Sequence, residues 1–431
     1  MGLDANPPAG TRDFLPAEAA RRDRVFATVR SAFERHGFAP LDTPAFERLD
    51  VLTGKYGEEG DQLMFKILRR GIHEDTGEAD LALRYDLTVP LARVVARYGS
   101  QLPTPFRRYQ VAPVWRADRP AKGRFREFVQ CDIDTVGSDS LVADATTIVA
   151  IADALSSLGL SGFRFQLNSR KTLRGLISAY GIPPALEVDT LTAMDKLDKI
   201  GVAGVADELR IRGLEARHAD ALVTDLSGDV PMADLRHRMS STNLGREGLA
   251  EIDSLVNLVA HADLDVEFTP TLARGLGYYT GPIFEVVHDG LGSSIAAGGR
   301  YDGLVEALGG PATPACGGSI GLERVLEILS GDEEPAGLDV LVTRLGGDEP
   351  ALALAAVARE HGWSAEPYAG TSSKLGTQLK YADRRGARAA LIQGDQELAA
   401  GTVTVKHLTT GDQAVVAVDD LPSHLRSLLD A

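Results

Sequence analysis

Side chains suited to binding a phosphate-bearing ligand gather in the first third of the chain. Arg116 follows one segment of alternating polar and apolar residues, and the next such segment carries further candidates at a spacing of two: Arg124, Arg126, Phe128 and Gln130. In a β-strand this spacing places side chains on one face. A single arginine on a strand usually only faces solvent. Because guanidinium groups pair bidentately with phosphate, several on one face favour a nucleotide site such as one for ATP.

Other common ways of holding a nucleotide are absent from the sequence. It contains no Gly-x-x-x-x-Gly-Lys-Ser/Thr phosphate loop and no Gly-x-Gly-x-x-Gly that opens a helix after a strand. A Walker-type ATPase and a Rossmann dehydrogenase are therefore disfavoured. Arginines that project from a sheet become the candidate nucleotide site.

The elements that must position these arginines are predicted from periodicity. Residues 18–36 have apolar side chains at helical spacing and end at Gly37. Residues 106–115 and 125–133 alternate as half-buried strands do, and the charged loop 117–123 joins them, which predicts a long antiparallel hairpin. Later in the chain we expect strands at 266–269, 283–287 and 294–296, a Gly-rich stretch, and a helix at 321–329.

Two changes of composition predict the domain organisation. Residues 171–261 are rich in Leu, Ala and charged residues at helical spacing, which predicts a helical insertion into the sheet. Residues 331–337 are polar and contain Gly and Pro, as linkers do. Beyond them strands and helices alternate as in βαβ units. We therefore expect a domain over 1–330, a linker over 331–337 and a second domain over 338–431.

Composition excludes several classes of protein. The chain has 431 residues, of which 44% are apolar and 25% charged, as in folded globular proteins of several domains. Cys131 and Cys316 are far apart and have no partner at metal-ligand spacing, so neither a structural metal nor a disulfide scaffold is predicted. The N-terminus lacks the features of a signal peptide and no run of 18 apolar residues occurs, so we expect a cytoplasmic protein without a membrane partner.

The charge of the chain is unevenly distributed. A formal net charge of −16 at first disfavours nucleic acid, because Lys and Arg supply most phosphate contacts. Residues 106–128 nevertheless carry seven basic side chains against two acidic ones: Arg107, Arg108, Arg116, Arg119, Lys122, Arg124 and Arg126 against Asp118 and Glu127. A solvated basic face is the alternative interpretation. The interleaved aromatic residues favour a local site for a polyanion.

Three segments resemble the signature motifs of class II aminoacyl-tRNA synthetases. Arg116, its loop and the return strand through Phe128 resemble motif 2. Gly317-Gly-Ser-Ile-Gly-Leu-Glu-Arg324 resembles motif 3, and Leu41-Asp-Thr-Pro-Ala-Phe-Glu47 resembles motif 1. The resemblance implies an α+β fold with an antiparallel sheet flanked by helices, interrupted by the helical insertion and followed by an α/β anticodon-binding domain.

Two further segments resemble signatures of one family in this class, the histidyl-tRNA synthetases. They are Arg274-Gly-Leu-Gly-Tyr-Tyr279, in which Gly277 stands where the family usually has Asp, and Gly298-Gly-Arg-Tyr-Asp-Gly-Leu304. Pro8-Ala-Gly-Thr-Arg-Asp-Phe14 is similar to the start of the family. Paired tyrosines are often core aromatics, but both signatures in order after motif 2 favour the family. The resemblance covers essentially the full chain.

The resemblance implies a role for each matching residue. Arg116 holds the ATP α-phosphate and the histidine carboxylate, Arg124 or Arg126 holds the terminal phosphates, and Phe128 and Arg324 sandwich adenine. Asp86, Leu87, Thr88 and Gln130 surround the α-ammonium group, Asp134 faces the imidazole, Tyr278 assists it and Tyr279 lines the pocket. Asp86 also suits an alternative role as a helix N-cap. Arg274 takes the place that magnesium holds in many class members, so Arg274 and Arg116 are the catalytic candidates.

The implied activity is the ATP-dependent ligation of L-histidine to tRNA(His) through histidyl-adenylate, with ATP arriving with Mg²⁺ and the enzyme acting as a homodimer. One alternative is a synthetase-like regulatory subunit of histidine biosynthesis. Such paralogues typically lack the anticodon domain and lose the ATP-binding and signature residues, all of which occur here. Another alternative is a different amino-acid specificity, against which Asp134 and the paired tyrosines argue.

Overall fold

The computed structural model describes residues 3–71, 76–121, 123–227, 230–273, 277–329 and 337–429. These divide into two compact units, Met1–Asp13 with Arg24–Ser330 and Phe14–Asp23 with Gly331–Ala431. Each unit has a hydrophobic core of its own. Residues 330–336, which include most of the expected linker, lie outside the described residues.

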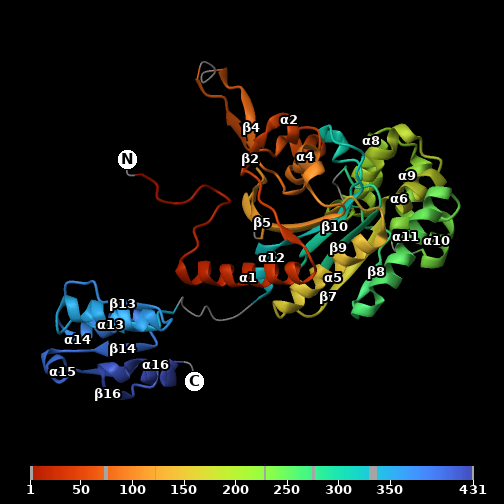
Figure 1. Cartoon of the computed structure of the whole chain (residues 1–431). Helices are drawn as coiled ribbons and strands as arrows, with labels where there is room; N and C mark the ends of the chain where they lie inside the picture. The colour runs from red at the N-terminus through yellow and green to blue at the C-terminus, as the bar shows by residue number, and fades with distance from the viewer. Residues whose placement is uncertain are drawn as a thin grey trace. The chain divides into compact units, whose positions relative to one another are not determined.

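The first unit is built on an eight-stranded sheet (Figure 1). Across the sheet the strands follow the order β1 (Ala39–Pro40), β5 (Phe106–Trp115), β6 (Glu127–Val136), β11 (Ala315–Gly321), β10 (Ala296–Arg300), β9 (Pro282–His288), β7 (Phe163–Ser169) and β8 (Val266–Phe268). The pairs at the two edges are parallel, and the pairs between them are antiparallel. The predicted α+β fold with an antiparallel sheet is confirmed.

The predicted hairpin is β5 and β6, which pair from Phe106 with Val136 to Trp115 with Glu127. The return strand begins at Glu127, later than expected. The reason lies in the backbone of the preceding residues: Arg124 forms a bridge with Ala121, and the Arg126 N–H donates to the Gly10 carbonyl at 2.7 Å. Residues 124–126 therefore pair with the loop and with the N-terminal segment.

Of two central strands, β11 was not expected from the sequence, and β10 (Ala296–Arg300) begins where the strand expected at 294–296 was to end. The Gly-rich stretch forms β11, and β10 carries Gly298 and Gly299. A Cβ on Gly298 would lie 2.6 Å from the Gly318 Cα and 2.6 Å from the Phe284 ring. Strands that approach so closely require glycine, although glycine disfavours isolated strands.

Helices cover the sheet and its ends. They are α1 (Pro16–Arg35), α2 (Leu49–Leu52), α3 (Gly57–Gln62), α4 (Thr88–Tyr98), α5 (Leu141–Ser157) and α12 (Leu322–Ile328). Alternate residues of β6 pack with α5, including Cys131 and Ile133 beside Ile148 and Ile151 in one core cluster. A second, three-stranded sheet of β2 (Phe46–Arg48), β4 (Ala79–Leu83) and β3 (Lys66–Leu68) had no counterpart in the sequence prediction because its strands are short.

The stretch predicted to be a helical insertion is helical. It contains α6 (Arg170–Ala179), α7 (Glu187–Met194), α8 (Leu197–Ile211), α9 (Ala216–Leu226), α10 (Met232–Met239) and α11 (Asn243–Val259), grouped beside the sheet in Figure 1. Helices α6 and α11 pack closely, since a Cβ on Gly175 would lie 2.5 Å from the Gly245 Cα. Short 3-10 turns occur at Gly99–Gln101, Pro184–Leu186, Ala260–Ala262, Glu306–Leu308 and Val418–Asp420.

The second unit contains a five-stranded sheet in the order β13 (Ala365–Pro367), β12 (Val340–Val342), β14 (Ala389–Ile392), β15 (Thr402–His407) and β16 (Gln413–Ala417). Its helices are α13 (Asp348–Glu360), α14 (Leu375–Arg384), α15 (Asp395–Ala400) and α16 (Leu421–Leu429). The first three strands are parallel, as βαβ units require, and the last two pairs are antiparallel. The expected α/β character is confirmed.

Candidate active site

A cleft of about 1080 Å³ opens over the face of the eight-stranded sheet opposite α5. On β6, Cys131 and Ile133 belong to the core that includes α5, whereas Asp132 and Asp134 line the cleft. Alternation along the strand therefore separates a core face from a cleft face. The volume is sufficient for a nucleotide and an amino acid together.

Small side chains in the central strands give the cleft its depth. Two rows of neighbouring residues cross the sheet: Asp132, Ser319, Ala297 and Glu285 in one, and Asp134, Gly317 and Gly299 in the next. The middle positions of both rows are Ser, Ala or Gly, so a hollow remains between the polar wall on β6 and the wall on β9. Gly317 and Gly318 of the glycine-rich motif line this hollow.

At one end of the cleft, Asp134 is held by two neighbours. It is 2% exposed, accepts a hydrogen bond from the Tyr301 hydroxyl, and lies 2.7 Å from Nη2 of the fully buried Arg108. Arg108 also donates to the Leu87 carbonyl at 3.1 Å. Burial raises the pKa of Asp134, and the guanidinium of Arg108 opposes that rise.

Asp132 precedes Asp134 by two residues on the same face of β6. It is equally buried, at 2% exposed, but its carboxylate is less well paired with positive groups. Its Oδ2 lies 4.0 Å from Arg108, and its Oδ1 has no hydrogen-bond partner among the residues that the structure describes. The pKa of Asp132 is raised to about 7, chiefly by burial; Arg108 and the Ser319 hydroxyl oppose this rise, and the charges of Asp134 and Asp86 add to it.

Asp86 both caps a helix and faces the cleft. Its Oδ1 accepts from the Tyr56 hydroxyl at 3.0 Å and from the Val89 N–H in the first turn of α4 at 3.0 Å. Its Oδ2 has no partner within the described part of the chain, and burial raises its pKa. The N-cap residue of α4 is Leu87 and not Asp86, but the bond from Asp86 to the first turn of the helix is compatible with the binding role predicted from the sequence. Thr88 also lines the cleft, whereas Leu87 is fully buried below it.

Gln130 lines the cleft on the same face of β6 as Asp132 and Asp134. Its Nε2 donates to Ser319 Oγ at 3.2 Å, and its Oε1 lacks a partner in the described residues. Together with Asp86 and Asp132 it presents uncompensated acceptor oxygens to the cleft. Buried acceptors of this kind are costly unless a donor reaches them, so this end of the cleft suits a ligand with N–H groups and positive charge.

Arginine gathers at the other end. Arg116 donates from Nε to the Tyr85 carbonyl at 3.1 Å, and its guanidinium carbon lies 4.3 Å from the Tyr85 ring centroid and 5.1 Å from that of Phe128. These contacts fix the guanidinium plane. Arg324 also lines the cleft, and its Nη1 donates to the Ser294 carbonyl. The cleft is therefore cationic at the Phe128 end and anionic at the Asp134 end.

The structure separates the two arginines predicted to share the return strand. Arg124 lines the cleft and donates to Asp118 at 2.8 Å. Arg126 does not line it; its Nε donates to the Asp118 carbonyl at 3.0 Å and its Nη1 to the Ala9 carbonyl at 3.4 Å. Of the two, Arg124 is the one placed to meet a ligand.

Both signature tyrosines line the cleft. The Tyr278 ring centroid lies 5.0 Å from that of Tyr279 and 5.9 Å from that of Tyr301. Burial, followed by the neighbouring Tyr279, Asp86 and Asp132, raises the pKa of Tyr278, which keeps its hydroxyl a donor. Arg274 lies outside the described residues. Gly277, by contrast, is exposed, and a Cβ there would meet no atom within 4 Å.

Several residues of the site were given no role from the sequence: Tyr56, Tyr85, Asp132 and Tyr301, which line the cleft, and Arg108, which is buried beside Asp134. The signal for Asp132 was available, because it shares the spacing of two with Gln130 and Asp134. Arg108 meets Asp134 only through the register of β5 and β6. Tyr56 meets Asp86 through the packing of distant segments. No local pattern predicts either contact.

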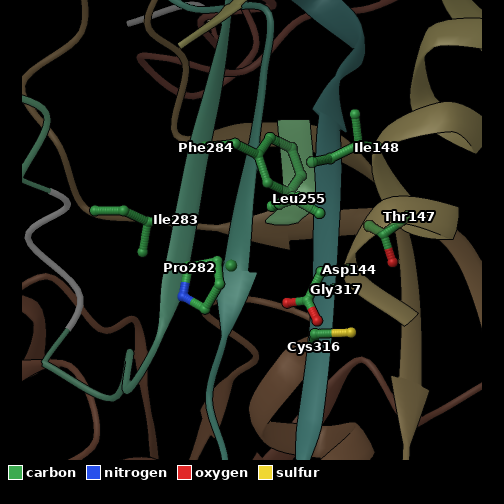
Figure 2. Close-up of a pocket in the computed structure, with 10 residues that line it drawn as sticks. Asp144, Thr147, Ile148, Leu255, Pro282, Ile283, Phe284, Cys316 and Gly317 are labelled. Atoms are coloured by element: carbon green, nitrogen blue, oxygen red, sulfur yellow. The ribbon is translucent and has the colours of Figure 1, made fainter. Parts of the chain in front are cut away.

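The opposite face of the sheet supports the cleft floor. Arg300 on β10 forms an ion pair with Asp144 on α5, and both are buried. Figure 2 shows Asp144 and Cys316 near one another, with Phe284, Ile148 and Leu255 gathered beyond them around a cavity of about 10 Å³. A void of that size is no larger than one water. This face is therefore packed core and holds the glycine strands in place.

Two general findings concern the described residues as a whole. Among them, no group of three or more His, Cys, Asp or Glu side chains is arranged to hold a metal ion. No helix in the described ranges is long and apolar enough to cross a membrane.

Comparisons with known proteins agree with this geometry. The family described as "Histidyl-tRNA synthetase" matches residues 10–325, and the "Anticodon binding domain" matches residues 339–428. A relative from Gloeobacter violaceus named histidine--tRNA ligase is 41% identical over 94% of both chains. The structure of histidyl-tRNA synthetase from Nostoc sp. PCC 7120 is 30% identical, with a TM-score of 0.79 over 99% of this chain and 100% of that one.

A further structure, titled an ATP phosphoribosyltransferase regulatory subunit/histidyl-tRNA synthetase from Bacillus halodurans C, is 23% identical. Its TM-score is 0.74 over 88% of this chain and 97% of that chain, so it shares the fold. The family model covers most of the chain and the relative from Gloeobacter covers nearly all of it, and on these grounds the chain belongs to the histidyl-tRNA synthetase family.

Proposed function

We propose that this chain is a histidine--tRNA ligase whose cleft carries out adenylation as follows. L-Histidine attacks the α-phosphorus of ATP through its carboxylate, pyrophosphate leaves, and histidyl-adenylate then passes its acyl group to tRNA(His). The observation that carries the proposal is the polarity of the cleft. Arg116, Arg124 and Arg324 lie at one end, and Asp86, Gln130 and the β6 carboxylates lie at the other.

At the cationic end, Phe128 and Arg324 bind the two faces of adenine. A guanidinium plane and an aromatic ring both stack on a base. Arg124 is the better placed of the two alternatives for the terminal phosphates, since Arg126 donates to the backbone of Asp118 and Ala9. Mg²⁺ arrives with ATP as part of the substrate. The acidic groups at this end, Asp118 and Glu323, accept hydrogen bonds from Arg124 and from the Val129 N–H.

At the anionic end, Asp86, Thr88 and Gln130 receive the α-ammonium group of histidine. The uncompensated oxygens of Asp86 and Gln130 supply the acceptors that three ammonium N–H donors need. Tyr278 and Tyr279 line the space beyond them, next to Asp134 and Tyr301. The imidazole therefore lies against the carboxylates of β6, and Leu87 supports the site from below.

Arg116, at the cationic end, is close enough to Asp86 to act on its charge, and it stabilises the reacting groups. In the transition state, negative charge builds on the α-phosphate and on the incoming carboxylate, and a guanidinium fixed in advance stabilises both without reorganising. The Tyr85 carbonyl and ring hold Arg116 in this way. By family resemblance, Arg274 supplies the second positive charge at the α-phosphate.

The remaining features of the proposal concern the whole molecule. Residues 1–330, with the insertion at about 171–261, are the catalytic domain; residues 331–337 are the linker, and residues 338–431 bind the anticodon. The enzyme works as a homodimer in the cytoplasm. The match of residues 339–428 to an anticodon-binding domain supports the tRNA partner.

Histidine-dependent exchange of pyrophosphate into ATP by the purified chain tests the proposal. We expect exchange with L-histidine and none above background with each of the other amino acids. Charging of tRNA(His) should follow with the same preparation. A chain that binds histidine but shows no exchange would be a regulator, and exchange with another amino acid would reassign the pocket.

A further inference from the structure

The buried side chain of Asn168 connects two segments that lie far apart in the sequence. Asn168 belongs to β7, is fully buried, and donates from Nδ2 to the Pro270 carbonyl at 3.0 Å and to the Leu272 carbonyl at 2.9 Å. Both acceptors belong to the turn after β8, in which the Leu272 N–H donates to the Thr269 carbonyl at 3.0 Å. The two donors of the Asn168 amide therefore fix the backbone of this turn.

The oxygen of the same amide is held by the start of the helical insertion. Asn168 Oδ1 accepts from the Ser169 N–H at 2.8 Å and from the Thr172 hydroxyl in the first turn of α6. A backbone N–H can only donate and a carbonyl can only accept, so one orientation of the amide satisfies its neighbours on both sides. All four hydrogen-bonding positions of the Asn168 amide are used in that orientation.

The turn held by Asn168 leads directly into the first family signature. Residues 271–273 line the cleft, and Arg274 follows them in the sequence. Leu272 and Ala273 also pack in the core of the first unit, which places their side chains, whereas the bonds from Asn168 set the path of the backbone. A shift of this turn would move the point from which Arg274 starts.

The segment that carries the signature is tied at its far end as well. Thr280 donates from its N–H to the Arg300 carbonyl at 2.8 Å and from its hydroxyl to Asp302 at 3.0 Å. Between the two ties, Gly277 is exposed, and a Cβ there would meet no atom within 4 Å. Asn168 therefore holds the segment before the signature, and Thr280 holds it after the paired tyrosines.

We propose that Asn168 is a positioning residue for adenylation: it fixes the backbone that enters the signature and thereby sets the reach of Arg274 toward the α-phosphate. The inference rests on the proposed function, which gives Arg274 its role there. A displacement of about 1 Å at a catalytic group can cost about 100-fold in rate, so loss of the two bonds to the turn should be visible in the chemical step. Because the first turn of α6 orients the same amide, the helical insertion and the signature meet at one side chain.

Asn168→Ala and Asn168→Asp test this role. The first substitution removes the amide, and the second keeps an acceptor for Ser169 and Thr172 but loses the donors to the turn. The first-order rate constant of histidyl-adenylate formation is measured in the pre-steady state at saturating histidine and ATP. There the amplitude reports the fraction of active enzyme, and the rate constant does not depend on it. Both variants should lower the rate constant about 10- to 100-fold, with a smaller change in the Kd for L-histidine.

Two comparisons separate positioning from a structural role. Thr147→Val removes a hydroxyl that is also buried and donates to a carbonyl, that of Ala143 at 3.0 Å, but on α5 at the opposite face of the sheet. It should leave the rate constant unchanged whatever its melting temperature. Asn168→Ala is also combined with Arg274→Ala, and in that background it should lower the rate constant by less than about threefold, because residues that act through one another are not additive.

Rate constants within about threefold of wild type in both Asn168 variants would overturn the assignment, as would an undiminished effect of Asn168→Ala in the Arg274→Ala background. Hydrogen exchange of the Leu272 amide needs no catalysis and, in the wild type, no variant. This amide should exchange as slowly as those of β7 in the wild type and faster in Asn168→Ala; rapid exchange in the wild type would refute the tie. A wild type that forms no histidyl-adenylate would refute the proposed function and still leave the tie decided by exchange.

Discussion

Asp132 should make the folded protein less stable at high pH than the same protein without that charge. Raising the pKa of Asp132 from 3.8 to about 7 corresponds to about 4 kcal/mol against the ionised form in the folded state. The folded pKa is higher than the unfolded one, so the folded state binds the extra proton. The unfavourable contribution is therefore absent below pH 3.8, grows as pH rises, and is complete above pH 7.

Asp132→Asn removes this contribution and retains the shape of the side chain. At pH 8 the variant should be more stable than wild type by up to about 4 kcal/mol, and at pH 5 by less than about 2 kcal/mol. Urea unfolding is monitored by hydrogen exchange of the β6 amides, so the measurement reports on the first unit alone. Asp139→Asn, the same exchange at an exposed position a few residues away, is the control for the substitution itself.

The reasoning would be refuted by either of two results. If Asp132→Asn is less stable than wild type at pH 8, the carboxylate makes contacts in the folded state that outweigh its burial. If the difference in stability is the same at pH 5 and pH 8, Asp132 does not titrate between them and its burial has no electrostatic consequence.

Three other changes have definite expected outcomes. Arg274→Ala should lower the adenylation rate about 10²- to 10³-fold, by analogy with the loss of an oxyanion donor, with histidine affinity much less affected; a near-normal rate of pyrophosphate exchange would contradict its catalytic role. Gly317→Ala places a Cβ 2.5 Å from the Asp134 Cγ and 2.6 Å from the Ile133 carbonyl, so histidine affinity should fall, and overpacking should cost about 1–3 kcal/mol in urea unfolding. Arg300→Met leaves the buried Asp144 without its counter-ion and should cost about 3–5 kcal/mol; restored stability in the double variant with Asp144→Leu would confirm the cause.

The hairpin and the helical insertion could be predicted because their signals are local. Alternation in residues 106–115 and helical spacing in residues 171–261 depend on neighbours in the chain. The strand β11 and all of β10 after its first residue could not be predicted in this way. Glycine has little strand propensity of its own, and these strands exist because their partners require a close approach.

For the site, most of the residues predicted from the sequence line the cleft, but the sequence could not say how their side chains are engaged. The spacing of two placed Arg124 and Arg126 on one face, yet Arg126 donates to the Asp118 carbonyl in the adjoining loop and to the Ala9 carbonyl, which lies more than a hundred residues earlier in the chain. The difference between Asp132 and Asp134 depends on Arg108 and Tyr301, which reach them through strand register and tertiary packing. Periodicity carries no information about such contacts.

The floor and the wall of the cleft share one physical feature: each is unfavourable for folding when considered alone. Gly317 and Gly299 contribute no side chains to the core and weaken the strands they occupy. Asp132 is a buried charge with incomplete compensation. The opposite face offsets these costs, with the Arg300–Asp144 pair and the dense packing around Phe284 behind the same strands. A small cationic ligand donates hydrogen bonds to the uncompensated acceptors on the wall of this hollow. The features that make the sheet locally less stable are therefore the ones that let it bind a ligand.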